Sequence, residues 1–121
     1  MIMLLIHRSE ILEQLNAFLQ SKGHETCIPG HHQDAVIATK DCHPRLIVLD
    51  LYLSEPSGLD VLKALRQAGY QGKVIVLSGE AMLSVACHAH SLGIDKVLHL
   101  PAKVAGHFDF GELETALKGA L

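Results

Sequence analysis

Short apolar runs alternate with segments of helical periodicity along the whole chain, and this alternation constrains its fold more than any other feature. Runs typical of β-strands occur at 2–6, 24–28, 46–49, 74–77 and 97–100. Apolar residues at helical spacing predict helices around 11–19, 31–40, 59–68, 80–92 and 112–121. Glycines follow three of these helices and are typical helix stops: Gly23, Gly69 and Gly93. Five strands that alternate with five helices predict an α/β fold, with a parallel sheet covered by helices on both faces.

An aspartate and a serine follow two of the predicted strands. The runs 46–49 and 74–77 are continuously apolar, as expected of central strands that are buried on both faces. The run 24–28 is more polar and belongs nearer an edge. Asp50 comes directly after the first central run and Ser78 directly after the second. Because ligands of open parallel sheets bind beyond the carboxyl ends of the strands, Asp50 and Ser78 are predicted to lie on the functional edge.

The composition favours one compact domain and argues against several classes of function. The 121 residues fit a single domain, 1–121, in which 49% of the residues are hydrophobic and only 19% are charged. A net charge of −3 and a pI near 6.3 provide no basic surface for nucleic acid. No apolar run approaches the roughly 18 residues of a membrane span, and the opening segment does not read as a signal peptide. A cytoplasmic protein is therefore expected.

Three cysteines and nine histidines raise the question of metal binding. Cys27, Cys42 and Cys87 show no CxxC spacing and are expected to be reduced, half-buried residues. The histidines at 31–32 and at 88 and 90 invite a zinc interpretation, but residues two apart on a helix point to different faces. Because no paired ligand motif supports a structural site, no metal is predicted.

The middle of the chain resembles a known family. The stretches LIVLDLYLSEPSGLDVLKALR, from Leu46, and VIVLSGE, from Val74, are similar to the receiver domain of two-component response regulators. The similarity covers essentially the whole chain and includes the spacing from Asp50 to Gly58, although the proline stands at 56 rather than at 54. It implies a flavodoxin-like doubly wound (βα)5 fold, with a five-stranded parallel sheet in the order 2-1-3-4-5.

The resemblance also implies roles for individual residues. Asp50 stands at the phosphoacceptor position and Ser78 at that of the switch hydroxyl, and the bond from Leu100 to Pro101 falls where the family commonly has a cis peptide. Members of the family transfer a phosphoryl group from a phosphohistidine to the aspartate. Two acids after the first strand hold Mg²⁺ together with that aspartate, and a lysine neutralises the phosphoryl oxygens.

Several of these partners are missing from the sequence. No Asp or Glu occurs before Glu10. The two acids are replaced by Ile6 and His7 or, after a one-residue shift, by His7 and Arg8. Leu100 takes the place of the lysine, and Val97 that of the aromatic residue that usually precedes it by three positions.

A second departure is the segment AKVAGH, 102–107. Family members usually run from the proline almost directly into a sequence like FDFGEL, which is 108–113 here. The added residues are expected to be a flexible extension of the loop. Lys103 within it could replace the missing lysine, and Arg8 could pair with Asp50 in the space of the missing ion. The alternative is that both cations are solvated loop residues.

Five other residues are open to more than one interpretation. Glu10, Glu55 and Glu80 could supply a substitute carboxylate, or could be ordinary charges of helix starts and loops. Cys87 and His88, on the predicted helix at 80–92, could sense redox state or bind metal, or could simply pack.

These observations favour a binding and regulatory module over an enzyme. Phosphorylation of Asp50 is expected to be weak or absent, and signalling would depend on contacts with a sensor kinase, a phosphotransfer protein or a fused output domain. The alternative is a functional phosphorelay receiver that uses Mg²⁺ in an unusual cation arrangement. The face formed by the fourth helix, fifth strand and last helix is the expected partner surface, and could also join two copies. A small metal- or ligand-binding enzyme is a third option, but no acid–base pair or glycine-rich phosphate loop supports it.

Overall fold

The computed structural model describes most of the chain: residues 1–6, 8–29, 35–50, 58–78, 93–94, 96–99 and 103–120. A parallel sheet in the order β2-β1-β3-β4-β5 consists of β1 (Ile2–Leu5), β2 (Thr26–Cys27), β3 (Leu46–Asp50), β4 (Lys73–Ser78) and β5 (Lys96–His99). The described helices are α1 (Ser9–Ser21), α2 (Ala35–Cys42), α3 (Gly58–Gln67) and α5 (Gly111–Ala120). The predicted doubly wound sheet and its strand order are confirmed. The helix predicted at 80–92 lies outside the described residues.

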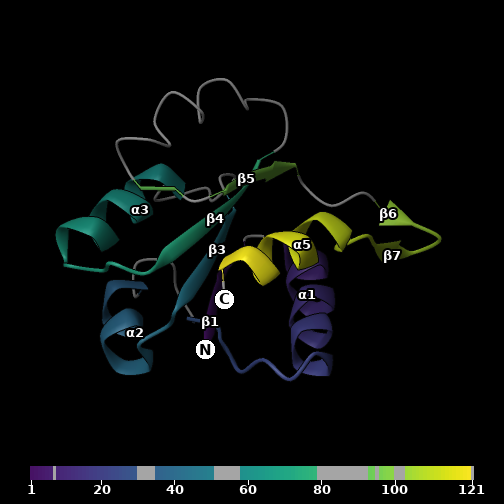
Figure 1. Ribbon diagram of the computed structural model, residues 1–121, viewed down its shortest axis with the longest axis horizontal. Coiled ribbons are helices and arrows are strands. Elements are labelled where there is room, and N and C mark those ends of the chain that lie inside the picture. Colours follow the sequence, from purple (N-terminus) through teal and green to yellow (C-terminus); the bar gives the residue numbers. More distant parts are fainter. Residues whose placement is uncertain are drawn as a thin grey trace.

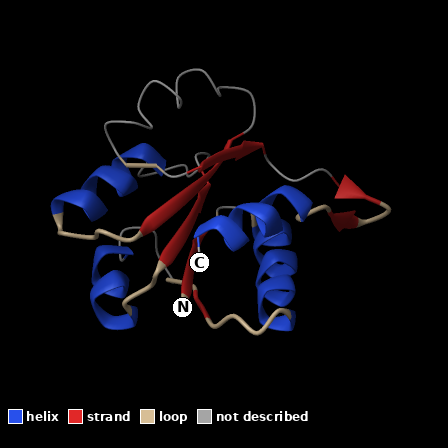
Figure 2. Ribbon diagram, in the orientation of Figure 1, coloured by secondary structure: helices blue, strands red, loops and turns tan. Residues whose placement is uncertain are grey.

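Two layers of helices cover the sheet. α2 and α3 lie on one face, and α1 and α5 lie on the other (Figure 1). Figure 2 shows the strands passing between these layers. Parallel neighbours cannot be joined by a tight turn, so the crossovers through α1, α2 and α3 carry the chain over a face of the sheet, and their helices cover it. α5 comes after the last strand of the sheet in the chain.

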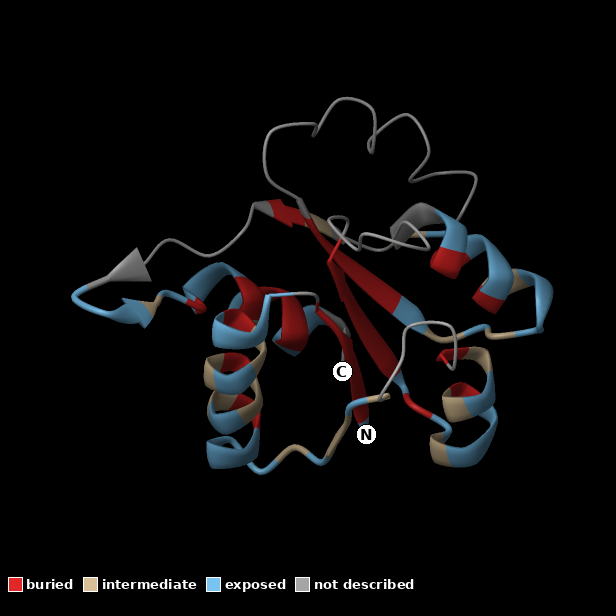
Figure 3. Cartoon of the chain, turned by 180° about the vertical axis from the view of Figure 1, so that it is seen from behind, coloured by how far each residue is buried: buried red, intermediate tan, exposed pale blue. Residues whose placement is uncertain are grey.

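The alternation of side chains along the strands divides the core into two clusters. Residues with even numbers in β1 and β3 pack against α1 and α5, for example Leu4 and Val48 against Leu15. Their odd-numbered neighbours pack against α2 and α3, for example Leu5 against Leu62. Burial is continuous along both strands (Figure 3). Full burial of a leucine side chain stabilises the folded state by about 1.5–3 kcal/mol. The buried side chains of the central strands therefore stabilise the packing of helices on both faces of the sheet.

The strand and helix ends differ little from the predictions. α1 ends at Ser21, and Gly23 follows with a φ of 86°, a conformation that glycine adopts without strain. β2 lies at the edge and has only two residues. β3 and β4 each run one residue further than predicted, so Asp50 and Ser78 are the last residues of their strands. Among the described helices, none is long and apolar enough to cross a membrane.

The segment expected to be a flexible loop extension forms a β-hairpin instead. β6 (Lys103–Val104) pairs antiparallel with β7 (His107–Phe108). Ala105 and Gly106 link them with φ values of 52° and 84°, as a two-residue type I′ turn requires. A lone hairpin is marginally stable, but here the Gln14 side chain of α1 donates to the Gly106 carbonyl at 3.2 Å and accepts from the Phe108 N–H at 2.8 Å. The expectation was wrong because this support comes from a residue distant in sequence.

Candidate functional site at the carboxyl edge of the sheet

Asp50 lies at the carboxyl end of β3, between β1 and β4, and its side chain is fully buried (0% exposed). All five residues of β3 are buried. The apolar residues 46–49 hold this strand in the core, and Asp50 is therefore placed at its end. Burying a carboxyl group costs free energy unless neighbouring groups stabilise it. The fold, rather than the preference of the side chain for water, therefore determines where Asp50 lies.

An apolar residue follows β1 at the edge where Asp50 ends β3. The last registered pair between β1 and β3 joins Leu5 to Leu49, so the residues that follow, Ile6 and Asp50, lie next to each other at the edge. Ile6 is 4% exposed and belongs to the core cluster of α1 and α5. The residue beside the predicted phosphoacceptor is therefore part of the hydrophobic core.

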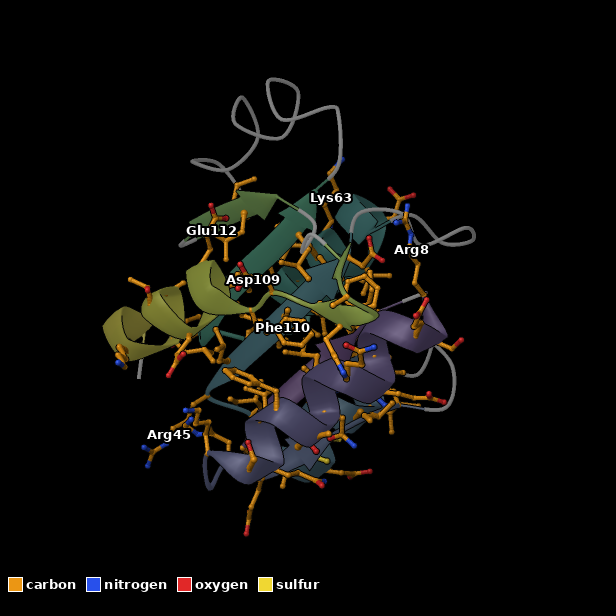
Figure 4. The ribbon with its side chains drawn as sticks, turned by 90° about the vertical axis from the view of Figure 1, so that its right-hand side faces the viewer. Arg8, Arg45, Lys63, Asp109, Phe110 and Glu112 are labelled. Carbon is orange, nitrogen blue, oxygen red and sulfur yellow. The ribbon has the colours of Figure 1, made fainter. Side chains whose placement is uncertain are left out.

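Arg8 stands immediately before α1. It is exposed, its backbone is extended, and its side chain makes no hydrogen bond that caps the helix. Figure 4 shows Arg8 at the N-terminal end of α1, at the opposite end of the molecule from Arg45, which precedes β3. Arg8 therefore places a cation between the end of β1 and the start of α1, at the carboxyl edge of the sheet.

On the other side of Asp50, the register brings Ser78 to the same edge. Asp50 pairs with Leu77, and Ser78 pairs with His99 of β5. The backbone of Ser78 therefore lies one residue beyond that of Asp50, on the neighbouring strand. This position is compatible with the predicted role of a switch hydroxyl, which remains a prediction.

The remaining predicted site residues have different positions. Val97 is half-buried and packs against the cluster of α2 and α3. Lys103 is part of β6, and its backbone pairs with that of Phe108. Glu10 is exposed in the first turn of α1, where an acid favours the helix dipole. The other predicted residues lie outside the described part of the chain: His7, Glu55, Glu80, Cys87, His88 and Leu100.

An aromatic cluster joins the hairpin to the core, and sequence reasoning did not single it out. The ring of Phe110 lies 5.4 Å from that of Phe18 and 6.4 Å from that of Phe108, measured between centroids. Asp109 accepts a hydrogen bond from the Gly111 N–H at 2.9 Å and so initiates α5. The sequence FDFG, 108–111, shows two phenylalanines that are two residues apart. The contact of Phe110 with Phe18 could not be predicted from it, because it forms only in the folded chain.

The described residues also bear on metal binding. Within them there is no group of three or more His, Cys, Asp or Glu side chains that could hold a metal ion. The histidines that invited a zinc interpretation, at 31–32, 88 and 90, are not among the described residues.

Comparison with known proteins identifies the class to which this fold and edge belong. Residues 7–106 match the family model of the response regulator receiver domain. The chain belongs to this family, whose members are signal-transduction modules of two-component systems.

Individual proteins show the same relationship. The chain is 32% identical over 91 residues to the acid tolerance regulatory protein ActR of Rhizobium meliloti, an alignment covering 75% of this chain and 47% of ActR. The receiver domain of NtrX from Brucella abortus superimposes with a TM-score of 0.84 at 24% identity, covering 100% of this chain and 98% of that one. The response regulator TrrA of Thermotoga maritima, solved in complex with Mg²⁺ and BeF, gives a TM-score of 0.79 at 23% identity, covering 99% and 97%.

The chain spans about half the length of the curated relatives it matches, since it covers 47% of ActR. Likeness to solved structures at these identities defines the fold.

Proposed function

We propose that this chain is an atypical receiver domain that signals through protein–protein contacts, with weak or no phosphorylation of Asp50. The observation that carries the proposal is the buried Ile6 next to Asp50, at the edge where family members hold Mg²⁺. Asp50 keeps the position of the acceptor, but the apolar neighbour offers no oxygen ligand.

Mg²⁺ does not fit the described residues of this edge. The ion demands near-octahedral coordination by oxygen, and carboxylates supply the protein's share. Asp50 offers one carboxylate, whereas Ile6 offers none and Arg8 carries a positive charge. Two unit charges about 4 Å apart interact by roughly 4 kcal/mol at an effective dielectric near 20, so losing two carboxylates lowers the affinity for a divalent ion by orders of magnitude.

A carboxylate without such an ion is a poor acceptor. Catalysis of phosphoryl transfer consists mainly of positioning the groups and neutralising the charge that spreads over the phosphoryl oxygens. With no divalent cation beside Asp50, its anionic oxygen and the anionic donor repel each other. Signalling then depends on the surface that the domain presents to its partners.

The proposal extends to partners and location. A sensor kinase, a phosphotransfer protein or an output domain in the same polypeptide would contact the receiver in the cytoplasm. Support comes from the match to ActR, which is named a regulatory protein and is about twice as long as the aligned region. A Mg²⁺-independent interaction with such a partner, unchanged in Asp50→Asn, is the expected behaviour.

Intact-mass spectrometry after incubation with acetyl phosphate and Mg²⁺ tests the proposal. We expect little or no phosphoryl adduct on the wild-type chain, and no Mg²⁺-dependent spectral change with beryllofluoride. The matched variants are His7→Asp and the pair Ile6→Asp with His7→Asp, which return acids to the end of β1. The double variant should gain a Mg²⁺-dependent adduct that disappears when Asp50→Asn is added.

The opposite result is equally clear. A strong Mg²⁺-dependent adduct on the wild type, lost in Asp50→Asn, would establish the alternative of a functional phosphorelay receiver. Because Ile6 is buried, circular dichroism must first show that the double variant folds. If the double variant does not fold, His7→Asp alone still tests the proposal, because it leaves Ile6 in place.

A further inference from the structure

Two cysteines that are distant in sequence meet on the face of the sheet covered by α2 and α3. Cys27 is the last residue of β2 and Cys42 is the last residue of α2, and their Sγ atoms lie 2.8 Å apart. Both are free thiols and both are half-buried, so small reagents reach them. We propose that Cys27 and Cys42 form a reversible intramolecular disulfide, a thiol-oxidation site separate from the Asp50 edge.

The sheet holds the first sulfur in place. Cys27 pairs with Met3 of β1, and its neighbour Thr26 pairs with Ile2. The Thr26 hydroxyl donates to the Asn16 side chain at 2.6 Å, which attaches this short edge strand to α1. A two-residue strand would otherwise fray, so these contacts give Cys27 a defined position.

The last turn of α2 holds the second sulfur. The His43 N–H donates to the Thr39 carbonyl at 3.0 Å and closes the turn that contains Cys42. The Thr39 hydroxyl in turn donates to the Val36 carbonyl at 2.7 Å. Both sulfurs therefore belong to regular elements, and their approach does not depend on a loose end.

The separation leaves little movement for bond formation. An S–S bond is about 2.05 Å long, so the two Sγ atoms need to approach by less than about 1 Å. Burial, followed by the hydrogen bond with Cys42, raises the pKa of the Cys27 thiol to about 11, so it stays protonated near neutral pH. The proposal takes Cys42, at the end of α2, as the sulfur that reacts first with an oxidant.

A low-molecular-weight disulfide, such as oxidised glutathione, serves as the oxidant. The Cys42 thiolate attacks one of its sulfurs, the S–S bond of the oxidant breaks, and a thiolate leaves. The Cys27 sulfur then attacks the mixed disulfide at Cys42, loses its proton, and releases the second thiol. Two protein thiols are oxidised to one disulfide, and one external disulfide is reduced to two thiols. Proximity makes the second step intramolecular and compensates for the raised pKa of Cys27.

The bond would join β2 directly to the end of α2. It would close the loop between positions 27 and 42 and so restrict the unfolded chain. In a reducing cytosol the pair would be open, and it would close under disulfide stress. The domain would thus gain a covalent response that needs neither Mg²⁺ nor Asp50.

The test treats the intact chain with oxidised glutathione and measures its mass, its linked peptides and its melting temperature. We expect a mass lower by about 2 Da and a tryptic link between Cys27 and Cys42. The melting temperature should rise by something on the order of 10 °C and return after dithiothreitol. Cys27→Ser should stop at a glutathione adduct on Cys42, whereas Cys87→Ser, the matched control, should still form the link.

Three outcomes would overturn the inference. The wild type could keep a stable glutathione adduct without an internal link, the link could join Cys87 or a second chain, or Cys87→Ser could abolish the mass loss. Each readout concerns the thiols alone, so its failure is distinct from a failure of the phosphorylation test.

Discussion

At the scale of single residues, an acid lies buried at the end of a central strand. Asp50 ends β3 with no exposed surface, and Ile6 directly follows β1, the strand beside it. On our proposal, an isoleucine of the core stands where a carboxylate would bind an ion. On that proposal, the difference between a conventional and an atypical receiver concerns a few atoms at the end of one strand.

Cys27 supports a prediction about pH at the same scale. Its pKa is raised from 9.0 to about 11, first by burial, then by the hydrogen bond with Cys42 and the charges of Cys42 and Asp41. A group whose pKa is higher in the folded state stabilises the fold below its unfolded pKa and loses that effect as the pH rises through the folded value. Under reducing conditions, the stability contributed by Cys27 should be complete below pH 9 and should fade towards pH 11.

Thermal melts of the reduced protein across this range provide the measurement, with Cys27→Ala for comparison. The advantage of the wild type over the variant should shrink as the pH rises, because only the wild type carries this thiol. Parallel curves for the two proteins would contradict the assignment.

At the scale of elements, the hairpin of β6 and β7 is a small antiparallel unit separate from the parallel sheet. It lies beside α1, where the two hydrogen bonds of Gln14 hold its turn and its second strand (Figure 1). Its strands have two residues each, so backbone pairing alone would not maintain it. We therefore expect the turn glycine and the distant glutamine both to be required.

Gly106→Val should therefore loosen the hairpin. A β-branched residue at a φ of 84° is strained, and the expected cost is about 1–2 kcal/mol. Amide hydrogen exchange at Phe108 should accelerate, while exchange in β3 should change little. The matched control is Gly119→Ala in α5, where an added Cβ meets nothing within 4 Å. Alanine there should be neutral or stabilise by up to about 1 kcal/mol. Unchanged exchange at Phe108 in Gly106→Val would show that the turn does not need its glycine.

At the scale of the whole molecule, stability depends on two core clusters that share one sheet. Each central strand contributes to both clusters, because alternate residues face opposite sides. Damage to one cluster is therefore expected to weaken the complete fold rather than one layer, and unfolding should be cooperative.

Leu65→Ala tests this expectation. Leu65 of α3 is fully buried, so its truncation should cost about 2–5 kcal/mol and lower the denaturant midpoint. Ile37→Ala in α2 is the control, since Ile37 is 61% exposed and its loss should change stability by no more than about 0.5 kcal/mol. Chemical denaturation followed by circular dichroism gives both values. Equal effects of the two substitutions would contradict the described core.

The sequence alone determined the class of fold and the position of the candidate site. Apolar runs and helical spacing are local patterns, and right-handed crossovers leave few arrangements of five strands and their helices. Asp50 could be placed at the carboxyl edge because it follows a continuous apolar run.

Only the tertiary structure decided which distant residues meet. The approach of Cys27 to Cys42, the attachment of the hairpin by Gln14 and the position of Ile6 beside Asp50 depend on strand register and on helix packing. Sequence spacing carries little information on these contacts, because they form only when separate elements pack together. Local sequence patterns therefore specify the helices and strands of this protein. The packing between them decides which reactive side chains come into contact.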